Sequence, residues 1–532
     1  MTERESRIPG PVEEKASGAE EASSSLSSQE AVFTDPQICR DIVNRNPMCT
    51  GKEVIPDYLN GRILVDWEGP QDKKNPRNWP VWRRLLVTLL IALCTTSLYM
   101  PASIVTPAQE EIQNMFHTTK VKAALDITLF VWGYGLGSLW FTPMSEIPVF
   151  RGRTPTYLAC QLIFCVLQIP TALTSHLGAF CVLRFLAGIF ASPPLSTAAA
   201  TISDLWDMPW RILAIIIWAF GAIAGPFIGP LIGAALTLTH PPSYIFWYVL
   251  AVSGGLLIFM VIFLQETSEQ ELLMRKAIRL RKATSDDRYI SPGEILMHTQ
   301  TVSAVLYEMF FKPIKMTITE PVLLFINFHI SLVYFTVYLY LEAMPIVYIE
   351  MYKFNTVQMG LCFFAFLVGA TCAALCYIFY TFSSAKRMGE PEKVFGPSAT
   401  FGAIMLPVGM FLWGWLSSPH IHWAIGFMGN FFFAVGAFVI FQSYFAMLSV
   451  LYPPSSAGSA FASNNIARSL LGGSACLYGG VMYTHTSIDN YPVGWGCSII
   501  GFVGIMLIPF PIFLTLKGRS LRQITQKKYS RE

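Results

Sequence analysis

The chain has 532 residues, of which 53% are hydrophobic and only 13% are charged, and its mean hydropathy is +0.47. A soluble domain usually carries about 25% charged residues, and no soluble fold could bury this much apolar surface. The composition therefore excludes a cytosolic enzyme, a secreted disulfide scaffold and a disordered protein, and it indicates a polytopic membrane protein. The net charge of +3 is too weak to attract nucleic acid. The eleven cysteines form no CxxC pair and no His/Cys ligand set, so no metal site is expected.

Residues 1–82 are predicted to form a disordered cytoplasmic tail. They carry an acidic patch near Glu13, a serine run near Ser23 and little apolar surface. No basic segment followed by an apolar run marks a signal peptide. Whether the tail is phosphorylated or is an inert tether stays open from the sequence.

Twelve apolar segments of roughly 18–25 residues follow, each long enough to cross about 30 Å of hydrocarbon. They are predicted at 85–105, 123–143, 155–174, 179–201, 212–236, 244–264, 322–343, 359–381, 396–416, 424–449, 460–483 and 495–515. We expect an all-α polytopic membrane protein with twelve transmembrane helices in two six-helix bundles, at 83–264 and 322–516. The central loop, 265–321, and the C-terminal tail, 517–532, are expected in the cytoplasm. A basic stretch from Glu271 to Arg281 predicts an amphipathic helix in the central loop.

The positions of the basic residues indicate the topology, because Lys and Arg concentrate on the cytoplasmic side of a membrane protein. With both termini in the cytoplasm, 25 of the 37 Lys and Arg flank the spans on the inner side. Only Lys120, Lys122 and Lys353 lie in outer loops. This asymmetry predicts cytoplasmic termini and supports the twelve spans.

Four ionisable residues lie within the predicted spans or at their ends, where a charge is costly and is a functional candidate. Arg184, in the fourth span, cannot deprotonate, so it would hold a carboxylate, a backbone carbonyl or water in the bundle interior. We expect Arg184 to take part in proton coupling, with a purely structural role as the alternative. Asp126 begins the second span and Glu342 ends the seventh, where external protons can reach a carboxylate. Arg468 opens the eleventh span, close enough to its end for the side chain to reach the interface.

A stripe of polar and aromatic residues follows one face of the seventh span, because Ser331, Tyr334, Tyr338 and Glu342 are spaced i, i+3, i+7 and i+11. We expect the stripe to line the substrate path, with Glu342 as a candidate proton site. An interfacial aromatic belt around a hydrated carboxylate is the alternative. Further candidates for the substrate path are Gln442 in the aromatic tenth span and Asn464, Asn465 and Arg468 in the eleventh.

The fifth span carries a ladder of small residues and prolines, namely Gly221, Gly225, Pro226, Gly229, Pro230 and Gly233. Glycines four residues apart give a helix one bare face, on which another helix can pack closely, and prolines kink the helix. The ladder predicts a flexible seam between moving bundles.

Several motifs resemble those of one transporter family. Ser145, Glu146, Gly152 and Arg153 fit the signature of loop 2–3, although Arg151 adds one residue to its usual spacing. The stretch Leu-Arg-Phe-Leu-Ala-Gly at 183–188 matches a span-four motif, and the fifth-span ladder matches a motif associated with antiporters. Asp-Trp-Glu-Gly-Pro at 66–70 is similar to a motif that precedes the first span of fungal drug:proton antiporters. Gln-Glu-Thr at 265–267 only partly resembles the signature that follows the sixth span of sugar porters.

Over about residues 65–520 the chain thus resembles the major facilitator superfamily. The resemblance is closest to its fungal twelve-spanner drug:proton antiporter branch, with the benomyl/methotrexate resistance pumps and cercosporin-type toxin facilitators. It implies alternating access, in which two halves rock around a central site and a proton moving inward drives a substrate out. It also implies a monomer in the bilayer of the plasma membrane that is not an enzyme and needs no cofactor besides the proton gradient.

The substrates we expect are hydrophobic or amphipathic molecules such as drugs, fungicides or a fungal toxin, because sugars and phosphates need denser polar linings. A facilitator or importer of a natural metabolite, such as a polyamine or vitamin, is the main alternative. A membrane enzyme or a receptor without transport fits the sequence less well.

Overall fold

The computed structural model describes residues 61–529 apart from 70, 147–151, 209, 300–302, 304–305, 385–389 and 453. Nearly all of the described chain is helical, and ten of its helices are long and apolar enough to cross a membrane. The acidic patch and serine run of the N-terminal tail, and Arg151 of loop 2–3, lie outside the described residues.

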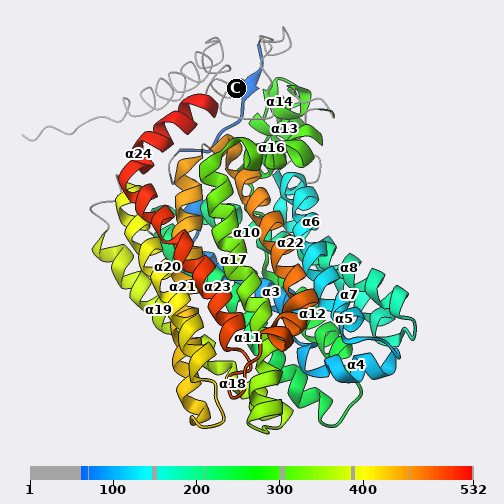
Figure 1. Ribbon diagram of the computed structural model, residues 1–532. Helices are drawn as coiled ribbons and strands as arrows, with labels where there is room; N and C mark the ends of the chain where they lie inside the picture. Colours follow the sequence, from blue (N-terminus) through cyan, green and yellow to red (C-terminus); the bar gives the residue numbers. More distant parts are fainter. Residues whose placement is uncertain are drawn as a thin grey trace, which may run out of the picture.

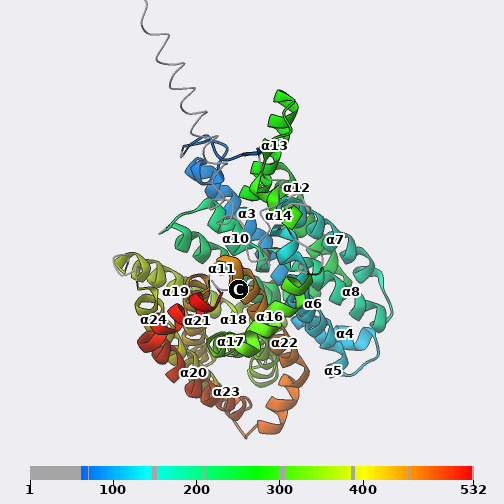
Figure 2. The ribbon, with the colours of Figure 1, turned by 90° about the horizontal axis from the view of Figure 1, so that it is seen from above.

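Two helical bundles lie side by side, one from each half of the chain (Figures 1 and 2). The N-terminal half contains α3 (Val81–Tyr99), α4 (Gln109–Met115), α5 (Lys120–Ala123), α6 (Leu125–Glu146), α7 (Arg153–Leu173), α8 (Leu177–Ala191), α9 (Pro193–Ser196), α10 (Ala198–Leu205), α11 (Trp210–Thr237) and α12 (Ser243–Phe263). The C-terminal half contains α17 (Pro321–Met344), a π-helix (Pro345–Met351), α18 (Thr356–Cys362), α19 (Phe364–Ser383), α20 (Pro391–Leu416), α21 (Phe427–Leu451), α22 (Pro454–Thr486), α23 (Gly494–Leu507) and α24 (Pro509–Tyr529). The all-α membrane fold expected from the sequence is confirmed.

Between the two halves, the chain forms short elements that gather at one end of the bundles (Figure 1). They are α13 (Glu269–Thr284), β2 (Tyr289–Ile290), α14 (Pro292–Thr299), a second π-helix (Tyr307–Phe311) and α16 (Lys312–Thr319). The amphipathic helix that the sequence predicts from Glu271 to Arg281 is present as α13.

Two predicted spans differ from the ten long apolar helices. The fourth is broken into α8, α9 and α10 at Pro193 and Pro194, because proline lacks the N–H that a helix interior needs and clashes with the preceding turn. The eleventh, α22, is continuous over 33 residues but is less apolar, since it carries Asn464, Asn465 and Arg468. The number ten therefore counts only the long apolar helices. The fourth and eleventh predicted spans also correspond to helices in the structure.

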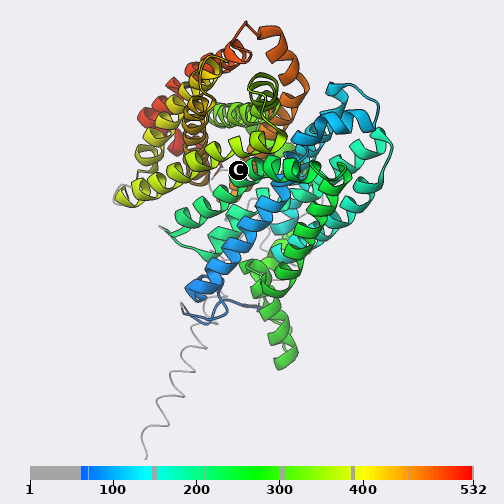
Figure 3. The same cartoon turned by 90° about the horizontal axis from the view of Figure 1, so that it is seen from below.

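The two halves meet along α6 and α22. Thr128 Oγ1 on α6 donates a hydrogen bond to the carbonyl of Gly473 (2.9 Å), and Trp132 Nε1 donates one to the carbonyl of Leu470 (3.1 Å). Carbonyls of an α-helix normally accept from its own backbone, so these contacts tie the two helices directly to each other. Seen from below, the bundles remain distinct on either side of this region (Figure 3).

The glycine face of the fifth-span ladder packs within its own half, against the first span. A Cβ added to Gly221 would lie 2.7 Å from the carbonyl oxygen of Ala92, and one added to Gly225 would lie 2.9 Å from that of Thr96. The chain that follows α3 faces the last two glycines of the ladder, Gly229 and Gly233. The expected glycine seam between moving bundles is thus corrected, because the bare face is used for close packing inside one bundle.

The opposite side of α11 contacts the C-terminal half. The helix continues through Pro226 and Pro230 without a break. Phe227 stacks on Phe366 of α19 with 4.7 Å between ring centroids. α11 therefore lies at the interface of the halves, where Phe227, Leu231 and Ala234 rather than the glycines of the ladder make the contacts.

Residues 63–68 dock on the central loop. The strand β1 (Ile63–Leu64) pairs in parallel with β2. Trp67 Nε1 donates to Glu269 Oε1 (2.8 Å), and Lys276 Nζ donates to the carbonyl of Asp66 (2.8 Å). The disorder predicted for the tail is therefore corrected for residues 63–68, because partners about 200 residues away in α13 and β2 order a segment with few apolar residues of its own.

Replacing Trp67 with Phe should loosen this docking while keeping the aromatic ring. The net value of one hydrogen bond is about 1 kcal/mol, so the docked segment should open about fivefold more often. Hydrogen exchange of the α13 amides measures this opening. Lys73→Ala, an exposed change shortly after this segment, is the control, and unchanged α13 exchange in Trp67→Phe would show that the contact does not hold the segment.

Candidate transport site

Both halves of the protein line one cavity. Its wall is mainly apolar and includes six aromatic residues, Tyr99, Trp218 and Phe227 from the N-terminal half and Tyr334, Phe441 and Phe445 from the C-terminal half. Small-molecule sites are mostly apolar and fitted with a few polar groups. The cavity therefore has the lining of a site for a small hydrophobic molecule.

Arg468 is the charged member among the described lining residues. It is only 4% exposed and lies well inside α22, which begins at residue 454. The expectation that Arg468 opens the span and reaches the interface is therefore wrong, because the helix starts earlier than its apolar stretch. Asn465 Oδ1 accepts from both Nε (2.9 Å) and Nη2 (2.6 Å), and Nη2 also donates to the Tyr99 hydroxyl (3.1 Å).

Three aromatic rings surround the Arg468 guanidinium. Its central carbon lies 5.3 Å from the ring centroid of Tyr334, 5.7 Å from that of Phe441 and 5.6 Å from that of Phe445. A cation near an aromatic face is attracted by the ring quadrupole, and the attraction grows when water is excluded. The two phenylalanines come from the aromatic tenth span, so a minority of that span's rings faces the cavity while others pack elsewhere.

A cluster of tyrosines joins three spans beside the cavity. Tyr134 on α6 shares hydrogen bonds with the hydroxyls of Tyr334 (2.7 Å) and Tyr338 (3.2 Å) on α17. The Tyr99 ring lies 5.4 Å from the Tyr134 ring. Of the predicted seventh-span stripe, Tyr334 therefore belongs to the wall of the site and Tyr338 to the cluster beside it, and Tyr134 links both to the N-terminal half.

Arg184 is fully buried in the N-terminal half, away from the cavity lining. Its Nη2 donates to the carbonyl of Pro101 (2.7 Å) and its Nε to the carbonyl of Asp126 (3.3 Å). The first span leaves regular helix near Pro101, so this carbonyl lies outside an α-helix and takes its partner from a side chain. The guanidinium also lies 4.4 Å from the Phe130 ring centroid. Of the partners that the sequence left open, backbone carbonyls are the ones observed.

Replacing Arg184 with Lys should destabilise the protein, because an ammonium lacks the planar fork that reaches two carbonyls. Losing one charged hydrogen bond costs about 1.5–3 kcal/mol, which predicts a fall in the melting temperature of roughly 1–3 °C for a chain of this length. Thermal unfolding of the purified protein measures this change. Arg279→Lys, on the exposed face of α13, is the control.

Transport per folded molecule then separates the two roles considered for Arg184. Normal proton-driven transport in Arg184→Lys, at a lowered melting temperature, assigns it a structural role. Loss of proton dependence in the folded variant assigns it a role in coupling.

The two predicted carboxylates, Asp126 and Glu342, are both buried. Gln109 Nε2 donates to Asp126 Oδ1 (3.0 Å), while Oδ2 has no hydrogen-bond partner among the described residues. The side chains of Glu342 and Lys120 both lie next to Gly480. A Cβ added to Gly480 would lie 3.8 Å from Glu342 Oε2 and 3.7 Å from Lys120 Nζ. The structure thus keeps both carboxylates in the interior and brings Glu342 close to a basic side chain of the other half.

The other predicted path residues do not line the cavity. Asn464 Nδ2 donates to Asn327 Oδ1 (3.0 Å), in a polar contact between α22 and α17. Ser331 Oγ and Gln442 Nε2 are buried without a hydrogen-bond partner in the described part of the chain. The sequence predicted that these residues line the substrate path, but burial between helices and exposure to a cavity look the same in a sequence.

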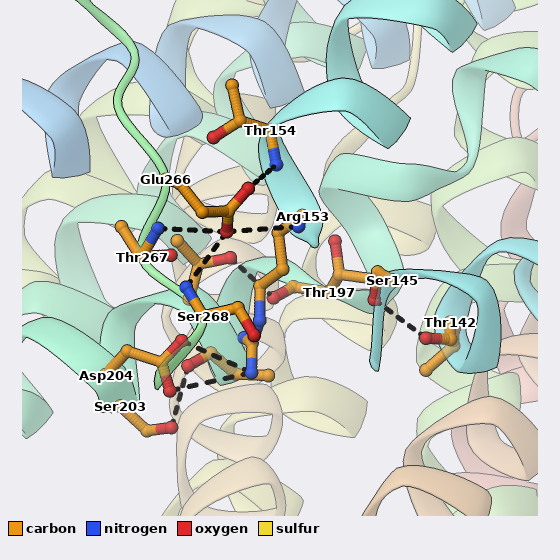
Figure 4. Close-up of polar contacts among 12 residues, drawn as sticks. Thr142, Ser145, Arg153, Thr154, Thr197, Ser203, Asp204, Glu266, Thr267 and Ser268 are labelled. Atoms are coloured by element: carbon orange, nitrogen blue, oxygen red, sulfur yellow. Dashed lines mark hydrogen bonds and ion pairs between the residues drawn. The ribbon is translucent and has the colours of Figure 1, made fainter. Parts of the chain in front are cut away.

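A carboxylate clip holds the N-terminal half together near the loop 2–3 motif (Figure 4). Glu266, just after α12, accepts four backbone N–H groups: those of Arg153 (3.1 Å), Thr154 (3.0 Å), Thr267 (3.0 Å) and Ser268 (2.9 Å). Arg153 and Thr154 begin α7, and the first N–H groups of a helix lack internal partners and attract negative charge. Glu266 therefore caps α7 and ties it to the end of the sixth span.

The Arg153 side chain adds an ion pair to this clip, 3.2 Å from Asp204 at the end of α10. Burial raises the pKa of the Asp204 carboxyl to about 7, and the Arg153 guanidinium acts in the opposite direction. The pair is therefore weakened as the pH falls below about 7 and the carboxyl takes up a proton. Ser145 of the same motif bonds back to the carbonyl of Thr142 in its own helix, and the Glu146 side chain lies outside the described residues.

Sequence reasoning missed Tyr99, Tyr134, Trp218 and Glu266 as members of these sites. Tyr134 lies in a glycine-rich tract whose spacing draws attention to the glycines, and Glu266 belongs to an incomplete sugar-porter signature. For Tyr99 and Trp218 the sequence offers no signal, since a lone aromatic residue in a span is most often a packing residue.

Comparison with known proteins identifies the family. The Major Facilitator Superfamily profile matches residues 91–475. The chain belongs to the major facilitator superfamily. It is 41% identical over 476 residues to a cycloheximide resistance protein of Candida maltosa, covering 88% of this chain and 86% of that relative. It is 36% identical over 480 residues to fluconazole resistance protein 1 of Saccharomyces cerevisiae, covering 89% and 86%.

The fold of this superfamily member also agrees with solved structures. A crystal structure of a D-xylose-proton symporter matches with a TM-score of 0.57 at 15% identity, covering 80% of this chain and 97% of that chain. At this identity the likeness concerns the fold alone. The protein is thus an integral membrane transporter, and the fungal drug-resistance branch predicted from its motifs is confirmed by its relatives.

Proposed function

We propose that this transporter exports hydrophobic or amphipathic small molecules, such as drugs, fungicides or a fungal toxin, in exchange for protons. The observation that carries the proposal is the cavity shared by both halves, with six aromatic residues and one arginine in its wall. The names of the relatives, resistance proteins for cycloheximide and fluconazole, support the same class of substrate.

Alternating access supplies the mechanism for such a site. A substrate held between the halves changes sides when one set of interface contacts opens and the other closes. The α6–α22 hydrogen bonds from Thr128 and Trp132 belong to the contacts that would separate in this motion. Both are single bonds from side chains to carbonyls, so they can break and re-form without unfolding either helix.

The protons are proposed to bind at Glu342, with Asp126 as the second candidate. Both carboxylates are buried and neither forms an ion pair within the described residues, so either can take up a proton without breaking a salt bridge. The distribution of basic residues supports an orientation with both termini in the cytoplasm, and we place a monomer in the plasma membrane. The proton gradient is the energy source, and no further cofactor is invoked.

Efflux from a yeast strain that lacks its own drug pumps tests the proposal. Expression should raise resistance to cycloheximide or fluconazole, and inside-out vesicles should take up the drug only while their lumen is acidic. A protonophore should abolish this uptake. Unchanged drug sensitivity at normal surface expression, or uptake that ignores the protonophore, contradicts drug:proton exchange, and uptake into intact cells would favour an importer.

A further inference from the structure

Arg468 places a fixed positive charge in the wall of the cavity with no carboxylate beside it. Its hydrogen bonds go to the amide oxygen of Asn465 and the hydroxyl of Tyr99, both of which are neutral groups. The described lining residues include no Asp or Glu. An arginine stays charged at any physiological pH, so the cavity keeps a positive charge that the protein leaves uncompensated at close range.

One end of the guanidinium is available to a ligand. Nε and Nη2 make all of the hydrogen bonds of Arg468, and Nη1 donates none within the described chain. Nη1 is also not among the fully enclosed polar atoms that lack a partner. Because Arg468 belongs to the cavity wall, a substrate oxygen can meet this donor directly.

The aromatic rings around Arg468 orient this charge without neutralising it. Tyr334, Phe441 and Phe445 attract the guanidinium through their ring quadrupoles but carry no net charge. They also make the surroundings of the charge apolar, and a charge interacts more strongly in surroundings of low dielectric constant. A flat ring on a substrate can pack on these same aromatic walls while its polar group reaches Nη1.

We propose that the cavity prefers cyclic or aromatic molecules with an ionised acidic oxygen, takes neutral molecules with a strong acceptor less well, and rejects cations. The proposal rests on the proposed export function and adds the charge of its substrates. Two unit charges about 4 Å apart at an effective dielectric constant of about 20 change an affinity by about a thousandfold. The difference between a matched anion and cation is therefore expected to be at least about a hundredfold, after allowance for the cost of desolvating the anion.

Three probes with the same ring test this order: naphthoate, naphthalenemethanol and naphthalenemethylammonium. Their equilibrium binding is measured at neutral pH on the full-length protein in nanodiscs made of uncharged lipid, so that the membrane itself does not select by charge. We expect the acid to bind at least about a hundredfold more tightly than the ammonium, with the alcohol between them. Equal affinities, tightest binding of the ammonium, or no binding of the acid overturns the proposal.

Arg468→Gln should reduce the ratio of acid to ammonium affinity to about threefold or less, whereas Arg468→Lys should keep its sign. Ala222→Asp adds a carboxylate to the same cavity and should lower or reverse the ratio without touching Arg468. This second variant keeps the test open if Arg468→Gln does not fold. An unchanged ratio in the folded variants shows that Arg468 does not set the charge preference.

Failure of this inference is distinct from failure of the export function. Proton-driven efflux of cycloheximide together with equal binding of the three probes leaves the function standing and removes the charge preference. The reverse result, a clear anion preference without any proton-driven efflux, supports the charged site and removes the export function.

Discussion

Gly152→Ala is expected to lower transport by at least about tenfold and to reduce the melting temperature by several degrees. Gly152 has a φ of +93° and a ψ of −160°, a backbone conformation that is essentially restricted to glycine. An added Cβ would lie 2.6 Å from both the carboxyl carbon and Oε2 of Glu266, so the new methyl group and the carboxylate cannot occupy their present positions together. The substitution therefore strains the backbone and displaces the acceptor of the clip.

The size of the effect follows from the four N–H groups that Glu266 accepts. Backbone strain of this kind costs about 1–3 kcal/mol, and each hydrogen bond to a charged group is worth about 1.5–3 kcal/mol. Loss of even one of these bonds together with the strain exceeds about 2 kcal/mol, which is more than a factor of ten in an equilibrium. The ends of the third and sixth spans that meet at Glu266 should then separate more readily.

Thermal unfolding and efflux at matched surface expression measure the two parts of this prediction. The control is Gly254→Ala in α12, where an added Cβ meets no atom within 4 Å and a helical alanine is intrinsically favourable. Glu266→Gln should give an intermediate loss, because an amide keeps one accepting oxygen but no charge. If Gly152→Ala melts and transports like the unaltered protein, the clip does not stabilise the N-terminal half.

The membrane fold could be predicted from the sequence because the length and apolar character of a span are local properties. Even the position of the fourth span, which Pro193 and Pro194 break, could be predicted, because its hydrophobic stretch is not interrupted. Arg468 was placed too close to a helix end for a related reason. The first residues of α22 are polar, so the helix begins before the point at which hydropathy indicates a span.

The direction in which a helix face points could not be predicted in the same way. The glycines of the fifth span show that some helix packs closely there, but their spacing cannot say whether that helix belongs to the same half. Likewise, the seventh-span stripe shows a buried polar face, yet only Tyr334 of its four members lines the cavity. The partner of Trp67 in α13 lies 202 residues away, a contact that no local pattern contains.

Glu342→Gln is the second large effect that we expect, namely loss of concentrative efflux with retention of downhill exchange. Glu342 is 8% exposed near the C-terminal end of α17 and has neither a hydrogen bond nor an ion pair in the described part of the protein. Glutamine has nearly the same size and polarity but cannot bind and release a proton. A conformational cycle that continues without proton exchange equilibrates the substrate instead of concentrating it.

The assay is drug uptake by acidified inside-out vesicles compared with counterflow at equal pH. One exchanged proton can support at most about a tenfold substrate gradient per pH unit, because a unit corresponds to about 1.4 kcal/mol. In Glu342→Gln this gradient should disappear, while counterflow should remain within about threefold of the unaltered protein, a change of less than 1 kcal/mol. Glu350→Gln, an exposed carboxylate eight residues further along the chain, is the matched control and should leave both activities intact.

Asp126→Asn distinguishes the two candidate proton sites. Asp126 lies beside Arg184, whose Nε bonds to the Asp126 carbonyl, so its basic neighbour belongs to the same half and stays in place when the halves separate. Glu342 shares its surroundings at Gly480 with Lys120 of the opposite half, and that neighbour can move away when the halves separate. A carboxylate whose basic neighbour comes and goes with the conformational change can gain and lose its proton in each cycle, whereas one with a fixed partner cannot. Retained gradient formation in Glu342→Gln together with its loss in Asp126→Asn would therefore move the coupling site to Asp126 and contradict this assignment.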